Sequence, residues 1–432
     1  MLLGYNIIQS ILLLPLFPFI ALYILFTPKY RSRIRSRLGI GLKRKLSTVL
    51  TGNREENKII WLHALSVGEV TSSVPLVQGL RNRYPEAKII FSATTASGRR
   101  VADSLLSRTV DVILDGPVDL LPVAAHFIRS IKPDCFILVE TDFWPNLLLL
   151  LTRKSVPTVL VNGRVSQKSF VGYQRMKWFF TPMFMSFAAL CMQTENDRQK
   201  MLTMGVCSGR LHTLGNLKFD TPAFLDGGNS TVAKTIKKQL PEGKTIFIAG
   251  STHPGEEELL LQSYCMLKKQ YPDFFMVIAP RDPKRSTEIA AAARSHDLTV
   301  SLRTENSAIK DKVDLFILNT IGELAACYSL GDIGFVGGSL VPFGGHNPIE
   351  PAAAALPVIL GPHMQDFSEI SASFINSGGA IMVRNIQELS GILTTLITSR
   401  ETRVRVGQAA LQVVTLQRGV INKHLGLIED FL

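Results

Sequence analysis

Two glutamates occupy positions where predicted strands end and where chemistry is commonly found in parallel sheets. Glu69 follows the predicted strand 58–63 and opens a predicted helix, 70–83, and Glu140 directly follows the predicted strand 135–139. Two carboxylates in one cleft can have their pKa values pushed apart, so that one serves as a base. Glu69 is also open to a structural interpretation, as a first-turn acid favoured by the helix dipole. The position favours a general base.

A glycine-rich loop in the second half of the chain has the features of a phosphate site. It spans residues 331–362 and places four glycines, Pro348 and Glu350 after the short predicted strand 333–336. The glycines, including Gly337, Gly338 and Gly345, allow close backbone approach. Asn347 is the expected N-cap of a helix whose first turn contains Pro348, and the N–H groups of that helix would favour an anion. Glu350 has the length to accept hydrogen bonds from a ribose, which predicts a sugar-nucleotide pocket. A crossover loop that merely contains many glycines is the alternative.

Further cations and hydroxyls follow other predicted strands and have the same expected location. Arg281 would clamp a phosphate through its planar guanidinium. The candidates that could contact an acidic substrate or a nucleotide are Arg164, Lys218, Ser251, Thr252, Pro280, Arg281, Ile321, Gly322 and Glu323. His63 and His346 are candidates for ligand contacts or for support of the site.

Several familiar motifs do not occur in the chain. The sequence has no Asp-x-Asp pair, no HExxH, no paired cysteine–histidine cluster and no Walker A lysine loop. A catalytic metal is therefore not expected. An ATPase or a dehydrogenase is also a poor fit, because the first half lacks GxGxxG after a strand.

These residues require a scaffold of alternating strands and helices. Apolar runs and amphipathic stretches alternate from residue 58 onward, which is typical of an α/β protein with parallel sheets covered on both faces. A turn-rich break near 217–243 divides the pattern into two doubly wound domains, whose strand ends could share one cleft. The predicted strands are 58–63, 88–92, 110–114, 135–139, 158–161 and 190–193, then 245–249, 274–279, 299–302, 315–318, 333–336 and 358–360.

Charge and hydropathy make the N-terminus distinctive. The 432-residue chain has a formal net charge of +12, and an apolar stretch, 7–26, precedes a basic run without acids. Nucleic acid is the first partner that such a run suggests, but an apolar segment followed by cations is more typical of a membrane segment with a cytoplasmic flank. The cations of the run are Lys29, Arg31, Arg33, Arg35, Arg37, Lys43, Arg44 and Lys45.

The apolar stretch is a poor signal peptide, because no positive region precedes it and no small-residue cleavage site follows. A spanning anchor is the preferred interpretation; Pro15 and Pro18 also allow an interfacial helix, and a buried core helix is the third alternative. The five cysteines are widely spaced, form no CxxC pair, and are expected to be reduced thiols.

Taken in order, the motifs resemble those of the 3-deoxy-D-manno-octulosonate (Kdo) transferases of lipopolysaccharide assembly. The similar segments cover about residues 1–370 and read HALSVGE, ETDFWPN, NGRVS, GNLKFD, GSTHPGEE, PRDP, IGEL, FVGGSLVPFGGHNPIEPA and GPHMQDF. The resemblance implies a GT-B glycosyltransferase with two Rossmann-like domains facing a central cleft. It also implies transfer of Kdo from CMP-Kdo to a lipid A precursor, lipid IVA, with inversion, without metal and without a cofactor.

The resemblance assigns roles to particular residues. Glu69 resembles the catalytic base, and Glu140 and Lys218 resemble residues that stabilise the transition state. The segments similar to the CMP-binding ones are Pro280-Arg281, Ile321-Gly322-Glu323 and Asn347-Pro348-Ile349-Glu350. Ile321 departs from many family members, which have methionine there, but an apolar exchange leaves backbone contacts intact.

The expected organisation follows from both lines of reasoning. The inner membrane is the expected location, with one N-terminal anchor and the catalytic domains on the cytoplasmic side, and no nucleic acid is expected as a partner. A sugar-nucleotide 2-epimerase and a membrane-tethered scaffold are the alternatives. The expected segments are an anchor over 1–28, a basic segment over 29–57, an acceptor domain over 58–220, a linker over 221–243, a CMP-Kdo domain over 244–412 and a C-terminal helix over 413–432.

Overall fold

The computed structural model describes residues 2–50, 57–220, 231–305 and 313–432. The chain forms two compact units, and each is described by itself. The first contains Met1–Asp220 together with Gly419–Leu432, and the second contains Thr221–Arg418.

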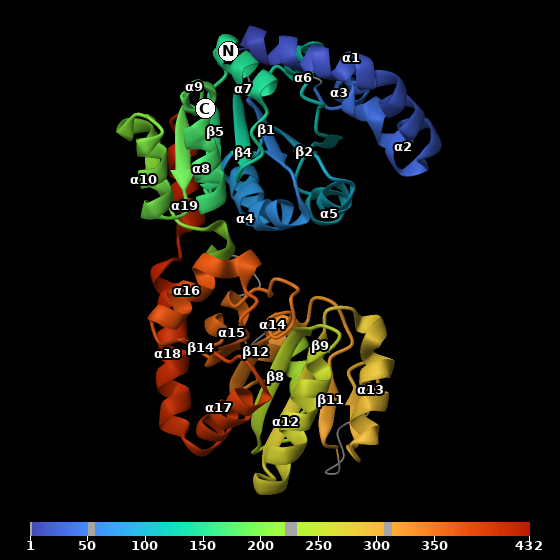
Figure 1. Cartoon of the computed structure of the whole chain (residues 1–432), viewed down its shortest axis with the longest axis vertical. Helices are drawn as coiled ribbons and strands as arrows, with labels where there is room; N and C mark the ends of the chain where they lie inside the picture. The colour runs from blue at the N-terminus through green and yellow to red at the C-terminus, as the bar shows by residue number, and fades with distance from the viewer. Residues whose placement is uncertain (1, 51–56, 221–230, 306–312) are drawn as a thin grey trace. The chain divides into compact units, whose positions relative to one another are not determined.

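The first unit is built on a parallel sheet with the strand order β3-β2-β1-β4-β5-β6-β7 (Figure 1). Its strands are rich in β-branched and apolar residues and are almost completely buried, as expected for a sheet covered on both faces. The order reverses between β1 and β4, so the loops after these two strands diverge and leave a crevice for ligands. The strands are β1 (Ile59–Ala64), β2 (Lys88–Ala93), β3 (Val112–Asp115), β4 (Cys135–Val139), β5 (Thr158–Gly163), β6 (Ala189–Met192) and β7 (Leu211–Thr213).

Two apolar cores lie on opposite faces of this sheet. One contains Trp61, Phe127 and Phe136 and is covered by α3, α6, α7 and α9. The other is covered by α4, α5 and α19. The helices are α1 (Leu2–Phe26), α2 (Pro28–Arg37), α3 (Leu42–Ser47), α4 (Val67–Arg83), α5 (Ala96–Leu106), α6 (Leu121–Ile131), α7 (Pro145–Arg153), α8 (Gln167–Arg175), α9 (Lys177–Phe184), α10 (Glu195–Thr203) and α19 (Val420–Glu429), with 3₁₀ turns η1 (Ser208–Arg210) and η2 (Leu217–Asp220).

The second unit repeats the plan with the parallel order β10-β11-β9-β8-β12-β13-β14. Its reversal point lies between β8 and β12, directly before the glycine-rich loop. The strands are β8 (Thr245–Thr252), β9 (Phe274–Pro280), β10 (Val300–Leu302), β11 (Leu315–Ile317), β12 (Ile333–Val336), β13 (Val358–Leu360) and β14 (Ala380–Met382).

Helices cover both faces of the second sheet as well. Buried side chains of α12, α13 and α17 form one core, and those of α11 and α14 contribute to the other. The helices are α11 (Thr231–Lys237), α12 (Glu256–Gln270), α13 (Ser286–Ser295), α14 (Leu324–Tyr328), α15 (Ile349–Ala353), α16 (Ser368–Asn376), α17 (Ile386–Thr398) and α18 (Arg400–Leu416), with 3₁₀ turns η5 (Pro283–Arg285) and η6 (Gln365–Phe367).

All twelve predicted strands are present, shifted by at most a few residues at their ends. Hydrophobic runs located them because strands buried on both faces are continuously apolar. Two short edge strands, β7 and β14, were not predicted. Each has three residues and is only partly buried, so neither produces a clear apolar run.

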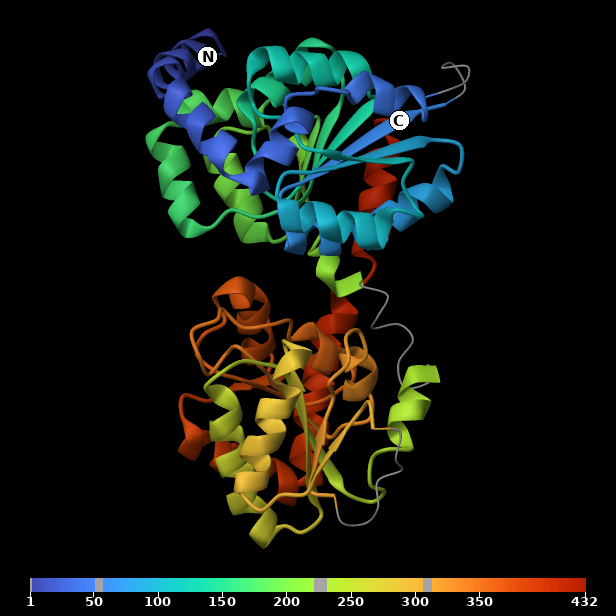
Figure 2. The ribbon, with the colours of Figure 1, turned by 90° about the vertical axis from the view of Figure 1, so that its right-hand side faces the viewer.

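The expected boundary at residue 413 is wrong, because α18 continues from Arg400 to Leu416. The final helix, α19, returns to the first unit (Figure 2). Its Val420, Leu425 and Ile428 are buried in the core beneath α4. Asp220 fixes the return by accepting hydrogen bonds from the backbone N–H groups of Gly419 and Ile421, at 2.9 and 2.7 Å. The C-terminal helix thus completes the first domain.

Two other segments have more structure than their expected roles required. Residues 221–230 of the expected linker lie outside the described residues, but the remainder contains α11, whose Ala233 and Ile236 are buried. In the expected basic segment, Leu42 and Leu46 of α3 are buried against α6. Apolar residues placed between cations therefore attach this segment to the first domain.

The N-terminal stretch forms the 25-residue helix α1, with Pro15 and Pro18 inside it. Many of its apolar side chains are exposed, and Leu14 and Phe19 have 74% and 72% of their surface accessible. In the part of the chain that the structure describes, no helix has the length and apolar character needed to cross a membrane.

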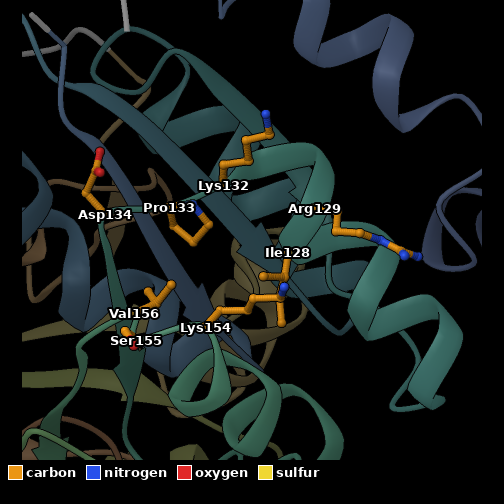
Figure 3. Close-up of a pocket in the computed structure, with 8 residues that line it drawn as sticks. All are labelled: Ile128, Arg129, Lys132, Pro133, Asp134, Lys154, Ser155 and Val156. Carbon is orange, nitrogen blue, oxygen red and sulfur yellow. The ribbon is translucent and has the colours of Figure 1, made fainter. Parts of the chain in front are cut away.

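A cavity of about 560 Å³ lies between the C-terminal ends of α6 and α7, near the starts of β4 and β5 (Figure 3). Three of its lining residues are cations, Arg129, Lys132 and Lys154, and Asp134 among them accepts a hydrogen bond from the Ile59 N–H at 2.7 Å. Cations at helix C-termini are favoured by the helix dipole. The cavity is at the edge of the sheet opposite the strand ends that carry Glu69 and Glu140.

Candidate functional site

Glu69 lies in the first turn of α4, immediately beyond β1. The Glu69 N–H donates to the N-cap Ser66 Oγ at 3.4 Å, and Glu69 Oε2 accepts from the Leu65 N–H at 2.5 Å. This arrangement resembles a capping box, in which a serine and a glutamate three residues later satisfy exposed N–H groups. The helix start therefore holds the carboxylate in one orientation at the reversal point of the sheet. The structure places Glu69 in the first turn of a helix, as its structural interpretation required, and at the sheet's reversal point, where a general base was expected.

The electrostatic environment of Glu69 makes it a stronger base than an ordinary carboxylate. The residue is only 6% exposed. Burial is the main cause that raises its pKa to about 8, with further increases from the charges of Glu140 and Asp142, while the Leu65 N–H and Ser66 act in the opposite direction. A carboxylate with a pKa near 8 accepts a proton more readily than one near 4.5, which suits general-base chemistry.

Glu140 stands at the end of β4 in a left-handed conformation, with φ of 63°. Such a backbone is uncommon for a non-glycine residue and is typical of functional positions. Its Oε1 accepts a hydrogen bond from Asn162 Nδ2 at 3.2 Å. Burial raises the pKa of Glu140, whereas the positive charges of Lys218 and Arg164 lower it. The structure thus brings Glu69, Glu140, Lys218 and Arg164 into one electrostatic cluster.

Asn162 links this cluster to the end of the domain. Its Oδ1 accepts from the Leu217 N–H at 3.0 Å, which holds the turn that carries Lys218. Asn162 is fully buried and has φ of 57°. It was not predicted as a site residue, although it opens the NGRVS segment, which begins at the end of β5. Its amide orients both an acid and the turn that supplies a cation.

A third carboxylate, Asp142, is held beside the first two. His63 Nε2 lies 3.3 Å from Asp142 Oδ2, and Thr94 Oγ1 donates to the same oxygen at 3.1 Å. Burial raises the pKa of Asp142, but the contact with His63 and the hydrogen bond from Thr94 act in the opposite direction, and the pKa lies below its ordinary value. Asp142 therefore remains charged and keeps the neighbouring Glu69 basic. His63 supports the site through this contact.

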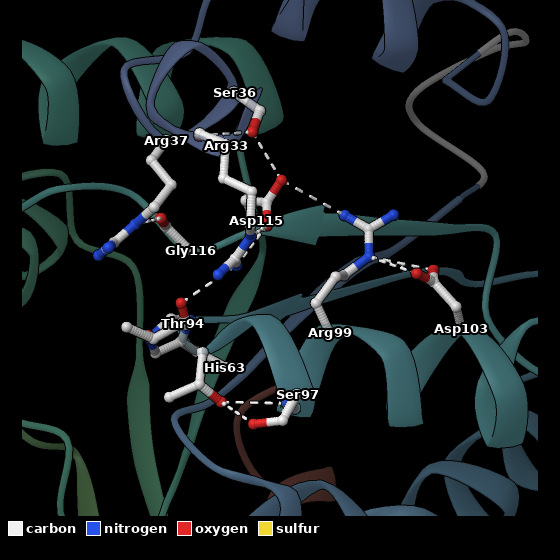
Figure 4. A network of polar contacts seen from close by, with 12 residues as sticks. Arg33, Ser36, Arg37, His63, Thr94, Ser97, Arg99, Asp103, Asp115 and Gly116 are labelled. Atoms are coloured by element: carbon white, nitrogen blue, oxygen red, sulfur yellow. Dashed lines mark hydrogen bonds and ion pairs between the residues drawn. The ribbon is translucent and has the colours of Figure 1, made fainter. Parts of the chain in front are cut away.

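Arg33 and Arg37 of the basic run face the strand ends (Figure 4). Arg33 Nε donates to Asp115 Oδ1 at 2.8 Å and Arg33 Nη2 donates to the Thr94 carbonyl at 3.1 Å. Arg37 Nε donates to the Gly116 carbonyl at 3.1 Å. Burial, with the charge of Arg33, lowers the pKa of Arg37. Two of the eight cations of the basic run are therefore bound to the first domain itself.

The first turns of α1 are attached to the same side of the domain. Tyr5 Oη donates to Asp119 Oδ2 at 3.1 Å, Gln9 Nε2 donates to the Asp119 carbonyl at 2.9 Å, and Asn6 Nδ2 donates to Asn146 Oδ1 at 2.7 Å. Asn146 lies in the first turn of α7, shortly after the segment that carries Glu140 and Asp142. The few polar residues of the otherwise apolar α1 therefore connect it to the start of α7 and so to the segment 140–144, which carries Glu140 and Asp142 and is called the acidic loop here.

In the second unit, the glycine-rich loop crosses closely over the end of β8. A Cβ on Gly337 would lie 2.2 Å from the Ser251 carbonyl oxygen, so only glycine fits. Gly338 has φ of 66°, and its N–H donates to Glu256 Oε1 at 2.6 Å. Ser251 itself has φ of 58°, and the adjacent Thr252 is buried. The predicted proximity of Ser251, Thr252, Gly337 and Gly338 is confirmed.

Two histidines meet within this loop cluster. His346 Nε2 lies 2.7 Å from His253 Nε2, and the Phe343 ring stacks on His253 with centroids 4.2 Å apart. Gly345 donates through its N–H to the Gly338 carbonyl at 2.9 Å, which closes the loop around them. Burial, with the charges of Arg281 and His253, lowers the pKa of His346 to about 4. The pair is therefore uncharged at neutral pH.

Glu350 and Arg281 complete the cluster. Burial raises the pKa of Glu350 to about 7, against a hydrogen bond with Asn347 and the charge of Arg281. The backbone N–H of Arg281 donates to the Thr252 carbonyl at 3.0 Å. Arg281 directly follows β9 and is exposed. The helix α15 begins one residue later than expected, at Ile349, with Pro348 as N-cap. Asn347 Oδ1 accepts from the Ile349 N–H at 3.2 Å, so it closes a local turn before the helix.

The segment 321–323 has a different environment. Arg303 binds the Glu323 carboxylate with two hydrogen bonds, of 3.0 and 3.1 Å. Ile321 is 86% exposed and Gly322 has φ of 85°. The Glu323 side chain is thus occupied by a structural ion pair, and Ile321 and the backbone before α14 remain accessible to a ligand.

The two folds and clusters define a class of protein: a pair of doubly wound domains, one with a buried carboxylate of raised pKa and one with a tightly packed glycine-rich loop. The fold is similar to that of a UDP-GlcNAc 2-epimerase from Neisseria meningitidis bound to UDP-GlcNAc. That structure aligns over 85% of this chain and 100% of its own, with a TM-score of 0.59 and 15% identity. This likeness shows the fold alone.

Sequence relatives define the family. Residues 32–221 match the family described as 3-deoxy-D-manno-octulosonic-acid transferase (kdotransferase). A 3-deoxy-D-manno-octulosonic acid transferase from Haemophilus influenzae is 32% identical over 421 residues, which cover 96% of this chain and 95% of the relative. A transferase of the same name from Rickettsia bellii is 29% identical over 98% of both chains. The chain belongs to the 3-deoxy-D-manno-octulosonic acid transferase family, as its motifs predicted.

Proposed function

We propose that the protein transfers Kdo from CMP-Kdo to a lipid A precursor, lipid IVA, in lipopolysaccharide biosynthesis. The observation that carries the proposal is the environment of Glu69, a buried carboxylate with a pKa of about 8 beside Glu140 and Asp142. Membership of the Kdo transferase family supports the identity of the sugar, and the glycine-rich cluster of the second unit supports a donor that carries a phosphate.

In the proposed reaction, Glu69 removes the proton from an acceptor hydroxyl. The acceptor oxygen attacks the anomeric carbon of Kdo from the face opposite the phosphate, which inverts the configuration. The bond from that carbon to the phosphate oxygen breaks, and CMP leaves with the electron pair. Lys218 and Arg164 supply positive charge beside Glu140, where they would stabilise the carboxylate of Kdo or its developing charges.

We assign donor binding to the second unit. Arg281 is accessible for the phosphate, and Glu350 is placed to accept hydrogen bonds from the ribose. Ser251, Thr252, Gly337, Gly338, Gly345 and His346 line the loop cluster in which the sugar phosphate would lie. Pro280, Ile321, Gly322, Glu323, Asn347, Pro348 and Ile349 are assigned to the nucleotide. No metal and no cofactor is part of the proposal.

We also propose that the protein acts at the cytoplasmic face of the inner membrane, to which α1 attaches it. The exposed apolar side chains of α1 support attachment, and Pro15 and Pro18 within the helix support an interfacial position over a straight span. An acceptor that resides in a membrane would then meet the domain that carries Glu69.

The deciding experiment measures CMP release from CMP-Kdo by the purified protein with and without lipid IVA, together with mass spectrometry of the lipid. We expect release that depends on the acceptor, and a lipid mass increased by one or more Kdo residues. CMP release without any change in the lipid would contradict transfer. A 2-epimerase, which the fold also permits, would act on its sugar nucleotide without an acceptor.

A further inference from the structure

The hairpin of α8 and α9 carries exposed apolar side chains that the core of the first unit does not use. Trp178 is 68% exposed, and Met176 and Val171 are also exposed. Tryptophan has an apolar body and a polar N–H, and it is favoured where one side of a protein meets a membrane surface. These three residues, together with Lys168, Arg175 and Lys177, are called the α8–α9 surface here.

The exposure of Trp178 is enforced by its neighbours. Phe180 and Phe184 of α9 turn the other way and pack with Tyr173 of α8, and their ring centroids lie 4.5 and 5.3 Å from the Tyr173 ring. Phe143 packs on Phe184 at 5.3 Å. Phe143 directly follows Asp142 in the acidic loop. The aromatic cluster therefore holds α9 in place and connects the α8–α9 surface to the segment that carries Glu140.

The charge of this region selects an anionic partner. Residues 143–194 contain no Asp or Glu. Arg175 and Lys177 are exposed on either side of Met176, with Lys177 directly before Trp178, and Lys168 is exposed in the first turn of α8. Lys177 Nζ also donates to the Thr203 carbonyl at 2.8 Å. Cations that flank exposed aromatic residues are the pattern of a protein surface that binds anionic lipid head groups.

The α8–α9 surface is also continuous with α1. The Tyr5 ring of α1 contacts the Phe179 ring of α9, with centroids 5.9 Å apart, and the two helices are neighbours at the N-terminal end of α1 in Figure 1. Leu3 and Ile7, which flank Tyr5, are exposed. Apolar side chains therefore extend from α1 onto α9.

We propose that the α8–α9 surface is a second membrane-binding element, which inserts Trp178 into the interface of an anionic bilayer while Lys168, Arg175 and Lys177 contact its head groups. Attachment through both α1 and the α8–α9 surface would fix the tilt of the first domain and present the acidic loop to the bilayer. The inference rests on the proposed function for the membrane as the place of action.

The experiment uses the full chain and vesicles of phosphatidylcholine with phosphatidylglycerol, some containing brominated acyl chains that quench nearby tryptophan. Trp61 is fully buried and Trp144 is partly buried against the core, whereas Trp178 is 68% exposed, so Trp178 is the tryptophan expected to respond. We expect quenching in the unmodified chain and its loss in Trp178→Phe. Equal quenching in both chains, or none in either while the protein is bound, would overturn the inference.

A charge experiment gives an independent measurement. Replacing Lys168, Arg175 and Lys177 with Gln should weaken binding to anionic vesicles by roughly 100-fold, on the basis of about five-fold for each cation near the surface. The matched control replaces Lys234, Lys237 and Lys238 with Gln, which removes three exposed cations from the second unit. An equal loss in the control would show a dependence on net charge alone and contradict the inference.

Two further measurements identify other outcomes. If sedimentation without lipid shows a dimer that Trp178→Ser converts to a monomer, a second copy of the chain covers this surface and the inference is wrong. Acceptor-dependent CMP release in detergent micelles should be retained in Trp178→Phe. Release without quenching rejects only the membrane inference, whereas quenching without release by the unmodified chain rejects the proposed transferase function.

Discussion

At the scale of single residues, the site depends on how burial and neighbouring charges set the protonation of three acids. Glu69 and Glu140 have raised pKa values because they are buried, whereas hydrogen bonds keep the pKa of Asp142 low. Burial, with the charges of Glu140 and Asp142, disfavours the charged form of Glu69, which makes Glu69 the most basic carboxylate of the three. The division into one base and two supporting acids follows from their environments.

Glu69→Gln is expected to reduce the transfer rate by about 10²–10⁴, because an amide cannot accept the acceptor proton. Affinity for CMP, measured by calorimetry, should stay unchanged, since the donor residues belong to the second unit. The glutamine keeps the size of the side chain, so circular dichroism should confirm an intact fold. Near-normal turnover by a folded variant would contradict the assignment of the base.

The pH dependence should reveal the raised pKa of Glu69. The base works when deprotonated, so kcat/KM should fall as the pH drops below about 8, the pKa of Glu69. Glu140→Gln removes one negative charge beside Glu69 and should therefore lower the pH at which kcat/KM begins to fall. Any loss of maximal rate in this variant is a separate effect. An acidic limb that stays near pH 4–5 in the unmodified protein would show that another group is the base.

Arg281→Ala should weaken CMP binding by about 1.5–3 kcal/mol, the usual contribution of a hydrogen bond to a charged group. The control is Lys284→Ala, an exposed cation in the same turn. Calorimetry with CMP compares the two variants. A similar loss of affinity in both would indicate a general effect of charge and would move the phosphate site elsewhere.

At the scale of elements, the N-terminal helices are integrated with the first domain. α3 is part of its core, α2 places Arg33 on Asp115, and α1 is hydrogen-bonded to Asp119 and Asn146. A simple anchor joined by a flexible basic linker would have none of these contacts. Removal of residues 1–28 should therefore affect the acidic loop as well as membrane attachment.

Arg33→Ala is expected to lower the free energy of unfolding by about 1–3 kcal/mol, because it leaves the buried Asp115 with fewer hydrogen bonds. The loss stays within this range since Ser36 Oγ still donates to Asp115 at 2.6 Å. Arg35→Ala is the matched control, an exposed arginine of the same helix that should change stability by less than about 0.5 kcal/mol. Urea unfolding of the full chain measures both, and equal stabilities would contradict the inward role of Arg33.

At the scale of the whole molecule, two domains of the same architecture carry different chemistry. The reversal point of the first sheet carries acids and cations, and that of the second carries glycines, hydroxyls and histidines. Proposed transfer needs both sets, because one activates the acceptor and the other holds the donor. The fold alone does not distinguish a transferase from a 2-epimerase, and the sequence relatives provide that distinction.

Transfer is expected to be independent of divalent metal ions, because the sequence has no Asp-x-Asp pair and its cations and loop N–H groups would carry the phosphate charge. An excess of chelator should leave acceptor-dependent CMP release unchanged in a purified assay. Loss of activity with chelator and its recovery with magnesium would show that a divalent metal ion stabilises the leaving group, and would contradict this prediction.

The sequence by itself determined the two α/β domains, the twelve main strands and most of the candidate residues. Strands buried on both faces are continuously apolar, and the residues after parallel strands necessarily gather at one edge of the sheet. Glu69, Glu140 and the glycine-rich loop were therefore identifiable from their positions relative to predicted strands.

Only the tertiary structure decided the partners of these residues. Asp115, Asp119 and Asn162 follow no local pattern that predicts their contacts with Arg33, Tyr5 and Glu140, because each contact joins segments far apart in the chain. The return of α19 to the first domain and the contacts of Arg33 and Arg37 in α2 also depend on segments that are far apart in the chain. Hydrophobic periodicity indicates which residues are buried. The contact partner of each side chain depends on packing that brings distant segments together.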